Sequence, residues 1–309
     1  MGIIKQPSEL SVKNTLSILI YGQPGTGKTT LGCSADDAVL FDYDGGVSRI
    51  NGAHAVPTLQ VDSWEDTNTA LQEIDQTGEY RTIVIDTIGK MLDYMSAYII
   101  RQDSKLAQRD GSLSLKGYGV RKKMFIDFLH RLQLSGRSVV FIAHEREERR
   151  GDDIVKRPEI GGSSANDLIK ELDLVGYLQM YGKDRVLSFN PSEYYYAKNT
   201  CGLPEQMKLP LLIDEKGGYS TNNFLTKITE RYEEAQMERV ATSTAYAELL
   251  DTAREVANEA KDVEGLNKAY NDLKGAEVIW DSKLQIWKIL TKKAEALGAT
   301  FNKVKNCYE

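Results

Sequence analysis

The chain has 309 residues, 41% of them hydrophobic and 27% charged, a composition typical of a globular protein with one large domain or a core domain plus an appendage. The formal net charge of −6 excludes a uniformly basic, histone-like protein, although a local basic strip could still hold nucleic acid. Three widely spaced cysteines and the lack of a long apolar run exclude a disulfide framework and a membrane span, so we expect a reduced, cytoplasmic protein.

Residues 16 to about 190 alternate between short β-rich runs and helix-length segments. The predicted strands are 16–21, 38–42, 82–86, 138–143 and 174–180, and the predicted helices are 28–34, 64–76, 88–108, 116–135 and 164–172. The run Val139–Ile142 is continuously apolar, which is typical of strands buried on both faces of a parallel sheet. The alternation predicts an α/β fold with a mostly parallel, doubly wound sheet that binds ligands at the carboxyl ends of its strands.

From about residue 223 the chain is rich in Ala, Glu, Lys and Leu and shows helical periodicity at 224–262 and 277–297. We therefore divide the chain into a core domain, residues 1–222, and an all-helical C-terminal domain, residues 223–309. The apolar residues expected to form the core of the second domain are Tyr246, Leu249, Leu250, Trp280, Leu284, Trp287 and Leu290.

The segment after the first predicted strand has the GxxxxGK[ST] pattern of a P-loop and opens the first predicted helix. Its glycines let backbone amides wrap closely around phosphates, and the helix dipole faces the same anion. We expect Lys28 to reach the β- and γ-phosphates of ATP and the Thr29 hydroxyl to bind Mg²⁺. The predicted ATP-binding residues are Gly22, Gln23, Pro24, Gly25, Thr26, Gly27, Lys28, Thr29 and Thr30.

Asp86 ends the apolar strand 82–86, where a charge beside the core has few other uses. We interpret this residue as the Walker B carboxylate, which completes the Mg²⁺ site together with Thr29. It could also cap the helix that begins near Ile88, a role compatible with the first.

Further short motifs follow in a fixed order: Asp42-Tyr43-Asp44-Gly45, Gly117-Tyr118-Gly119, Ile160-Gly161-Gly162-Ser163, and Tyr196-Ala197-Lys198-Asn199 ahead of Gly202-Leu203-Pro204. With the P-loop and Asp86, this order resembles the phage-encoded nucleotide-binding proteins of the RecA/RadA superfamily, which include single-strand annealing ATPases. The resemblance covers about residues 14–215. It implies a RecA-like P-loop NTPase core that assembles as a filament or ring and binds single-stranded DNA.

The resemblance also implies which residues act on the attacking water. RecA-type ATPases carry an acidic residue after the strand that follows the P-loop helix, a position that Asp44 fits best and Asp42 second. Both could instead only form the turn before Gly45. A polar residue at the end of a later central strand senses the γ-phosphate in these proteins, which suggests His144, unless that histidine is merely structural.

The segment 145–162 lies where the superfamily keeps a mobile DNA-binding loop. It is polar and flanked by glycines, and its basic residues suit phosphate contacts. It also holds six acidic residues, so an ordinary solvated loop is the alternative. The candidate DNA-binding residues are Arg146, Arg149, Arg150, Lys156 and Arg157. A second strip, Lys116 with Arg121–Lys123, could line the same channel.

In RecA-like oligomers a basic residue of one subunit reaches the γ-phosphate bound by its neighbour and stabilises charge in the transition state. Lys198 is the first candidate for this role and Arg185 the second. The active site would then be complete only in a homo-oligomer.

Together these observations predict a Mg²⁺-dependent, DNA-stimulated ATPase that binds single-stranded DNA and promotes annealing or recombination. We expect it to be phage-encoded, to act in the cytoplasm of a bacterial host, and to meet a single-strand-binding protein. The alternative is a regulatory or assembly switch acting on a protein partner, which the C-terminal domain motivates. A small-molecule kinase is a third hypothesis, with Arg146–Arg150 as its lid, but no acceptor-binding pattern accompanies it.

Overall fold

The computed structural model describes residues 5, 14–151, 153–162, 164–213 and 217–309. It divides into two compact units: the first is Asn14–Glu233, and the second contains Glu234–Glu309. Helix α6 (Phe224–Glu259) belongs to both, because the division falls within it. Among the described helices, none combines the length and the apolar character needed to cross a membrane.

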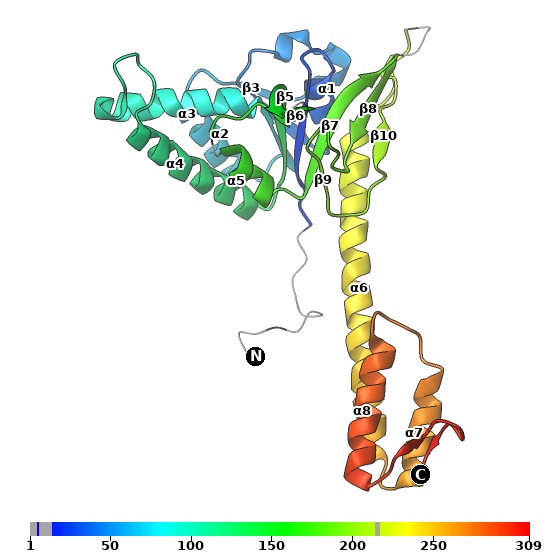
Figure 1. Cartoon of the computed structure of the whole chain (residues 1–309). Helices are drawn as coiled ribbons and strands as arrows, with labels where there is room; N and C mark the ends of the chain where they lie inside the picture. Colours follow the sequence, from blue (N-terminus) through cyan, green and yellow to red (C-terminus); the bar gives the residue numbers. More distant parts are fainter. Residues whose placement is uncertain (1–4, 6–13, 152, 163, 214–216) are drawn as a thin grey trace. The chain divides into compact units, whose positions relative to one another are not determined.

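One sheet organises the first unit (Figure 1). Its strands are β1 (Ser17–Gly22), β2 (Ala38–Asp42), β3 (Thr58–Gln60), β4 (Thr82–Asp86), β5 (Ser138–Arg150), β6 (Asp153–Pro158), β7 (Leu174–Tyr181), β8 (Asp184–Ser188), β9 (Lys198–Asn199) and β10 (Gln206–Lys208). They lie in the order β10-β8-β7-β1-β5-β4-β2-β3, with β6 paired to β5 and β9 paired to β7. The neighbours from β3 to β7 are parallel, and β6, β8, β9 and β10 are antiparallel. The predicted α/β class with a mostly parallel sheet is thereby confirmed.

Successive side chains of a strand point to opposite faces of the sheet, so these fully buried strands need cover on both faces. Helices supply it. The helices are α1 (Lys28–Gly32), α2 (Trp64–Thr77), α3 (Ile88–Gln102), α4 (Leu115–Leu134) and α5 (Ser164–Glu171). Ile83 and Ile85 join the core formed with α2, α3 and α4. The side chain of Val84 faces the other way, where a Cβ on Gly32 of α1 would come within 2.9 Å of it. The sheet is thus doubly wound, with the P-loop helix α1 on one face and α2, α3 and α4 on the other.

Strand β5 is longer than predicted. Its first six residues, Ser138–Ala143, are buried in the sheet. The strand then continues to Arg150 and pairs antiparallel with β6, Glu145 opposite Pro158 and Arg150 opposite Asp153. The segment 145–162, which the sequence suggested as a loop, therefore folds largely as a hairpin.

The second unit contains the end of α6, α7 (Val263–Lys274), α8 (Ser282–Leu297) and a two-stranded sheet of β11 (Phe301–Asn302) and β12 (Cys307–Tyr308). It is mainly helical rather than all-helical, because it also contains this pair of short strands. The aromatic rings of Phe301 and Tyr308, which lie opposite each other in the pair, pack together.

The core of the second unit agrees only partly with the seven residues expected there. Leu250 and Leu290 are buried in it, whereas Trp280 and Leu284 are 61% and 52% exposed. Trp280 precedes α8, and Leu284 lies on the side of the helix away from the buried row Ile286, Leu290 and Ala294. Helical spacing alone did not reveal which face of α8 is covered.

Candidate functional site

The P-loop joins the end of β1 to the start of α1, as the sequence predicted. Gly22 is required by space, because a Cβ there would lie 2.1 Å from the carbonyl oxygen of Leu178 on β7. Gly25 and Gly27 have φ of 80° and 92°, a left-handed conformation that favours glycine. These three glycines allow a tight turn at the N-terminus of α1, and backbone amides in such a turn suit an anion.

Lys28 is buried and turns its ammonium group into the loop. Its Nζ donates hydrogen bonds to the carbonyl oxygens of Gly22 at 2.9 Å and Gln23 at 2.7 Å. Burial lowers the pKa of Lys28, while the nearby carboxylates of Asp86 and Glu145 act in the opposite direction. Phosphate oxygens can replace the two neutral carbonyls as acceptors and would give the ammonium group a negatively charged partner.

Thr29 and Asp86 meet at the carboxyl ends of β1 and β4. The Thr29 hydroxyl donates to Asp86 Oδ2 at 2.6 Å, and the Asp86 side chain is almost fully buried. Burial raises the pKa of Asp86, and the carboxylates of Asp42 and Asp44 raise it further. A hydroxyl beside one carboxylate fits Mg²⁺, which takes few protein ligands and completes its shell with phosphates and water. No cluster of three or more His, Cys, Asp or Glu side chains suited to a metal occurs in the described residues.

The two candidate bases have different surroundings. Asp42 accepts hydrogen bonds from the backbone amides of Gly46 and Val47, both at 3.0 Å, so its carboxylate holds the turn after β2. Asp44 is partly exposed, and its Oδ2 lies 3.8 Å from Nε2 of His144. His144 stands directly beside Gly22 in the register of β5 and β1. Asp44 and His144 therefore flank the P-loop together.

Glu145 is a site residue that sequence reasoning missed. Its carboxylate is only 7% exposed; Oε2 accepts a hydrogen bond from the Tyr177 hydroxyl at 2.9 Å, and Oε1 lies 3.3 Å from Lys156 Nζ. The interaction with Glu145 contributes to the pKa of Lys28, which places this charge near the P-loop. The sequence grouped Glu145 with the acidic residues of a loop; its position directly after His144 was the only available signal.

The two basic residues proposed to act between subunits lie in different places. Lys198 pairs opposite Val175 near the start of β7, and its Nζ donates to the carbonyl oxygens of Ile169 and Leu172 at the end of α5. That end of the sheet is opposite to the P-loop of the same chain. A role of Lys198 on a neighbouring subunit stays a prediction, while capping of α5 explains its position here. Arg185 instead contacts its own P-loop, with Nε donating to the Thr26 carbonyl oxygen at 3.0 Å.

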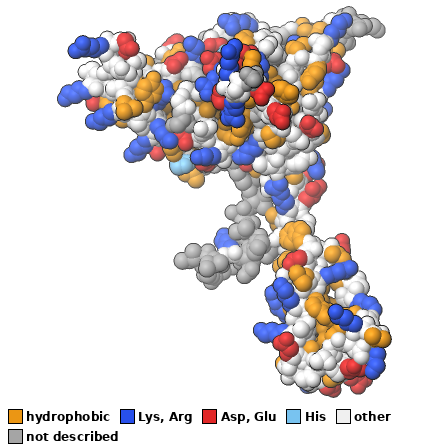
Figure 2. All heavy atoms as spheres, viewed as in Figure 1, with side chains coloured by type: hydrophobic (Ala, Val, Ile, Leu, Met, Phe, Trp, Pro, Cys, Tyr) orange, Lys and Arg blue, Asp and Glu red, His pale blue; other side chains and the backbone are white. Residues whose placement is uncertain are grey.

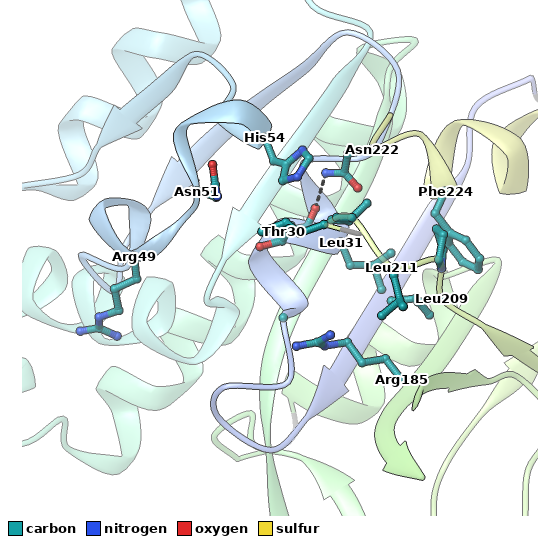
Figure 3. A pocket seen from close by; sticks show the side chains of 14 residues that line it. Thr30, Leu31, Arg49, Asn51, His54, Arg185, Leu209, Leu211, Asn222 and Phe224 are labelled. Atoms are coloured by element: carbon teal, nitrogen blue, oxygen red, sulfur yellow. Dashed lines mark hydrogen bonds between the residues drawn. The ribbon is translucent and has the colours of Figure 1, made fainter. Parts of the chain in front are cut away.

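A cavity of about 340 Å³ adjoins Gly27 and Thr30 (Figure 3). Leu209, Leu211 and Phe224 line one side of it. Asn51 and His54 line the other side. Asn222 Nδ2 donates to the Thr30 carbonyl oxygen at 2.8 Å and closes the cavity near α1. The volume and the mixed apolar and polar lining match those of small-molecule sites. The sequence gave no indication of this cavity, since its walls come from distant segments.

The five candidate DNA-binding residues lie on two faces of the β5–β6 hairpin. On one face Glu148 is shared by Arg157 at 2.9 Å, Arg150 at 3.3 Å and Arg146 at 3.9 Å. These residues border a groove of about 230 Å³ beside the start of α5. On the other face Lys156 pairs with Glu145 and Glu147, and Arg149 is exposed.

The second basic strip is not a continuous surface. Arg121 is buried: its guanidinium lies 4.8 Å from the Tyr118 ring and donates to the Ser96 hydroxyl at 3.1 Å. Burial lowers the pKa of Arg121. Lys122 is paired with Asp167 at 3.0 Å. Arg121 and Lys122 therefore have structural contacts, whereas Lys123 is exposed.

A comparison with protein families places these features in a known group. A family model described as an AAA domain matches residues 14–201, a span that includes the P-loop, Asp86 and the whole β5–β6 hairpin. A comparison with curated proteins gave no match. The match extends over more than half of the chain and coincides with the phosphate-binding geometry of β1, α1 and β4. The chain therefore belongs to the AAA-domain family of P-loop NTPase-type proteins.

Proposed function

We propose that the protein is a Mg²⁺-dependent ATPase that binds single-stranded DNA and promotes annealing or recombination. The observation that carries the proposal is the continuity of β5. This strand reaches the P-loop at His144 and continues directly into the hairpin with the arginine cluster. One element thus lines the nucleotide site and bears the basic residues suited to phosphates.

In the proposed reaction, the P-loop amides and Lys28 hold the β- and γ-phosphates. Thr29 and Asp86 would hold the metal ion, which neutralises charge that develops on the phosphates. Asp44, beside His144, orients the attacking water and accepts its proton. Arg185 is held over its own loop by Thr26, so it can stabilise phosphate charge from within the chain. The cavity between Thr30 and Leu209 suits the nucleoside.

DNA binding would use the three arginines that share Glu148. One carboxylate among three guanidinium groups leaves a net positive charge on that face of the hairpin. DNA phosphates can take the place of Glu148 as partners of these arginines, and a bidentate contact to each would strengthen binding. Copies of the chain and a single-strand-binding protein remain further expected partners.

The test is ATP hydrolysis by the full chain, with and without single-stranded DNA. Lys28→Ala should abolish hydrolysis, whereas Lys90→Ala, at an exposed lysine of α3, should not. DNA should stimulate hydrolysis by the wild type. Arg146→Ala with Arg150→Ala should raise the DNA concentration needed for half-maximal stimulation roughly tenfold. The matched change at exposed arginines elsewhere, Arg81→Ala with Arg101→Ala, should leave stimulation intact.

Two outcomes would redirect the proposal. Hydrolysis that depends on Lys28 but ignores DNA would favour a switch that acts on a protein partner. Hydrolysis that survives Lys28→Ala would remove the P-loop from the reaction and contradict the proposed activity altogether.

A further inference from the structure

The second unit exposes large apolar side chains in and just before α8. Trp280, Leu284 and Trp287 are 61%, 52% and 37% exposed. Single exposed apolar residues are common, but two tryptophans and a leucine close together in the chain form a patch. Leu284 and Trp287 are three residues apart on α8, so their side chains lie on the same side of the helix. We call Trp280, Leu284 and Trp287 the aromatic face.

Neighbouring rings hold both tryptophans in place. The ring of Trp280 lies 5.0 Å from that of Tyr246 on α6, and the Tyr246 hydroxyl donates to Asp281 at 2.7 Å. The ring of Trp287 lies 4.8 Å from that of Phe301 on β11, edge to face. The Tyr308 ring also lies nearly parallel to that of Trp287, at 6.3 Å, so Trp287 has two ring neighbours and Trp280 has one. Both tryptophans keep part of their surface exposed. Rigid, half-supported rings lose little entropy when a flat partner stacks on them.

The segment that carries the aromatic face has an excess of lysines. Residues 278–309 contain six lysines and three acidic residues, whereas residues 234–277 contain five basic and ten acidic ones. Lys283 and Lys288 flank the aromatic face on α8 and are exposed. Neither forms an ion pair with another described residue. The three acidic residues have local partners: Asp281 accepts from Tyr246 and Gln285, and Glu309 pairs with Lys305; Glu295 lies two turns further along α8.

In Figure 2, hydrophobic side chains reach the surface of the unit that carries α7 and α8, with both basic and acidic side chains around them. A flat apolar ligand with regularly spaced negative charge would satisfy both components. Unpaired nucleotides have these properties, since their bases stack on aromatic rings and their phosphates meet lysines.

We propose that the aromatic face binds single-stranded nucleic acid, with bases stacked on Trp280 and Trp287 and phosphates held by Lys283 and Lys288. This site uses none of the residues of the hairpin or the P-loop. It requires neither ATP nor the proposed ATPase activity, and it gives the second unit a function of its own.

The tryptophans make the site directly observable. The chain has three tryptophans, and the third, Trp64, is 4% exposed and packs on Phe128 in the first unit. An oligo-dT strand added to the full chain without nucleotide should quench tryptophan fluorescence. The quenching midpoint should move to higher concentration as salt is raised, because phosphate contacts release counterions.

Variants separate stacking from charge. Trp280→Ala should weaken binding of oligo-dT roughly tenfold and reduce the quenching amplitude, as the loss of one stacked base predicts. Lys283→Glu with Lys288→Glu should weaken it further and flatten the salt dependence. The control is Lys261→Glu with Lys268→Glu, the same charge change at exposed lysines of this unit outside α8, which should bind like the wild type.

A further variant distinguishes binding at the aromatic face from binding at the β5–β6 hairpin. In a chain that already carries Arg146→Ala and Arg150→Ala, Trp280→Ala should still weaken oligo-dT quenching roughly tenfold, because the aromatic face lies outside the hairpin. Absence of quenching by oligo-dT, or equal affinity of the α8 variants and the wild type, would overturn the proposal. Quenching by an acidic peptide but not by oligo-dT would overturn it as well and would identify a protein-binding surface.

Discussion

Asp86 is a buried carboxylate that its surroundings disfavour as an anion. Burial raises its pKa above the ordinary value, and two further aspartates near it act in the same direction. For an acid whose pKa is raised by folding, the free energy of unfolding decreases as pH rises through the range between the unfolded and folded pKa. Near neutral pH the charge therefore costs stability unless a cation compensates it. This is the property that a metal-binding carboxylate needs.

Asp86→Asn should separate stability from function. Without added Mg-ATP the variant should melt at a higher temperature than the wild type, because the buried charge is gone; about 1 kcal/mol corresponds to roughly 2–4 °C for a domain of this size. Mg-ATP should raise the melting temperature of the wild type but scarcely that of the variant, and hydrolysis should be lost. Thermal melts with and without Mg-ATP check this, and a variant less stable than the wild type would contradict the argument.

Asp42 and Asp44 should respond differently to the same substitution. Asp44→Asn should lower the hydrolysis rate about 10²–10⁴-fold with nucleotide binding retained, because only the group that handles water is changed. Asp42→Asn should instead destabilise the fold by about 1–3 kcal/mol, because Asp42 accepts two backbone hydrogen bonds with its charge. Turnover and melting temperature, measured on both variants, decide the assignment; the reverse pattern would make Asp42 the base.

At the scale of elements, the β5–β6 hairpin positions its charges by register. Strand pairing brings Arg157 opposite Arg146, and Glu148 lies between them and Arg150. Glu148 thus offsets part of the repulsion among the three arginines and leaves the cluster positively charged. It is partly exposed, so its ion pairs contribute little to stability, typically about 0–1 kcal/mol each.

Glu148→Gln should therefore strengthen DNA binding, although most changes in a site weaken it. With the competing carboxylate removed, the three arginines are available to phosphates, and the affinity for oligo-dT should rise several-fold with a steeper salt dependence. Glu159→Gln, near the end of the same hairpin, is the matched control. Anisotropy titrations at two salt concentrations test this; weaker binding by Glu148→Gln would mean that the carboxylate organises the arginines for DNA.

The elements also show which features sequence can predict. The P-loop and Asp86 were predictable because each depends on a short contiguous pattern: glycines at fixed spacing, or a carboxylate at the end of an apolar run. The contact of Arg185 with Thr26 joins positions 159 residues apart, and the arginine cluster depends on strand register. Neither has a local signal. The exposure of Trp280 was missed for a similar reason, since periodicity finds an apolar face but not what covers it.

At the scale of the whole molecule, the first part of α6 belongs to the first unit. Leu225, Ile228 and Tyr232 are buried, and the amides of Leu225 and Thr226 donate to the hydroxyl and carbonyl oxygens of Ser34 just after α1. The helix is therefore fixed to the P-loop region before it enters the second unit.

Two truncations should consequently differ. Removal of 234–309 should leave a folded protein that binds ATP, whereas removal of 224–309 should cost at least several kcal/mol, since burial of each such side chain contributes about 1.5–3 kcal/mol. Melting temperature and nucleotide binding of both truncations check this. Equal stability of the two would show that the start of α6 contributes nothing to the first unit.

The continuity of β5 has a thermodynamic consequence for the proposed function. If ATP at the P-loop changes the affinity of the hairpin for DNA, then DNA must change the affinity for ATP by the same factor, because the two effects share one coupling free energy. The strand would then act as a reciprocal link: DNA would recruit nucleotide as strongly as nucleotide recruits DNA. If the coupling is positive, loss of the nucleotide after hydrolysis would weaken the binding of DNA to the hairpin. Each turnover would then release the DNA whose binding had increased the affinity for ATP.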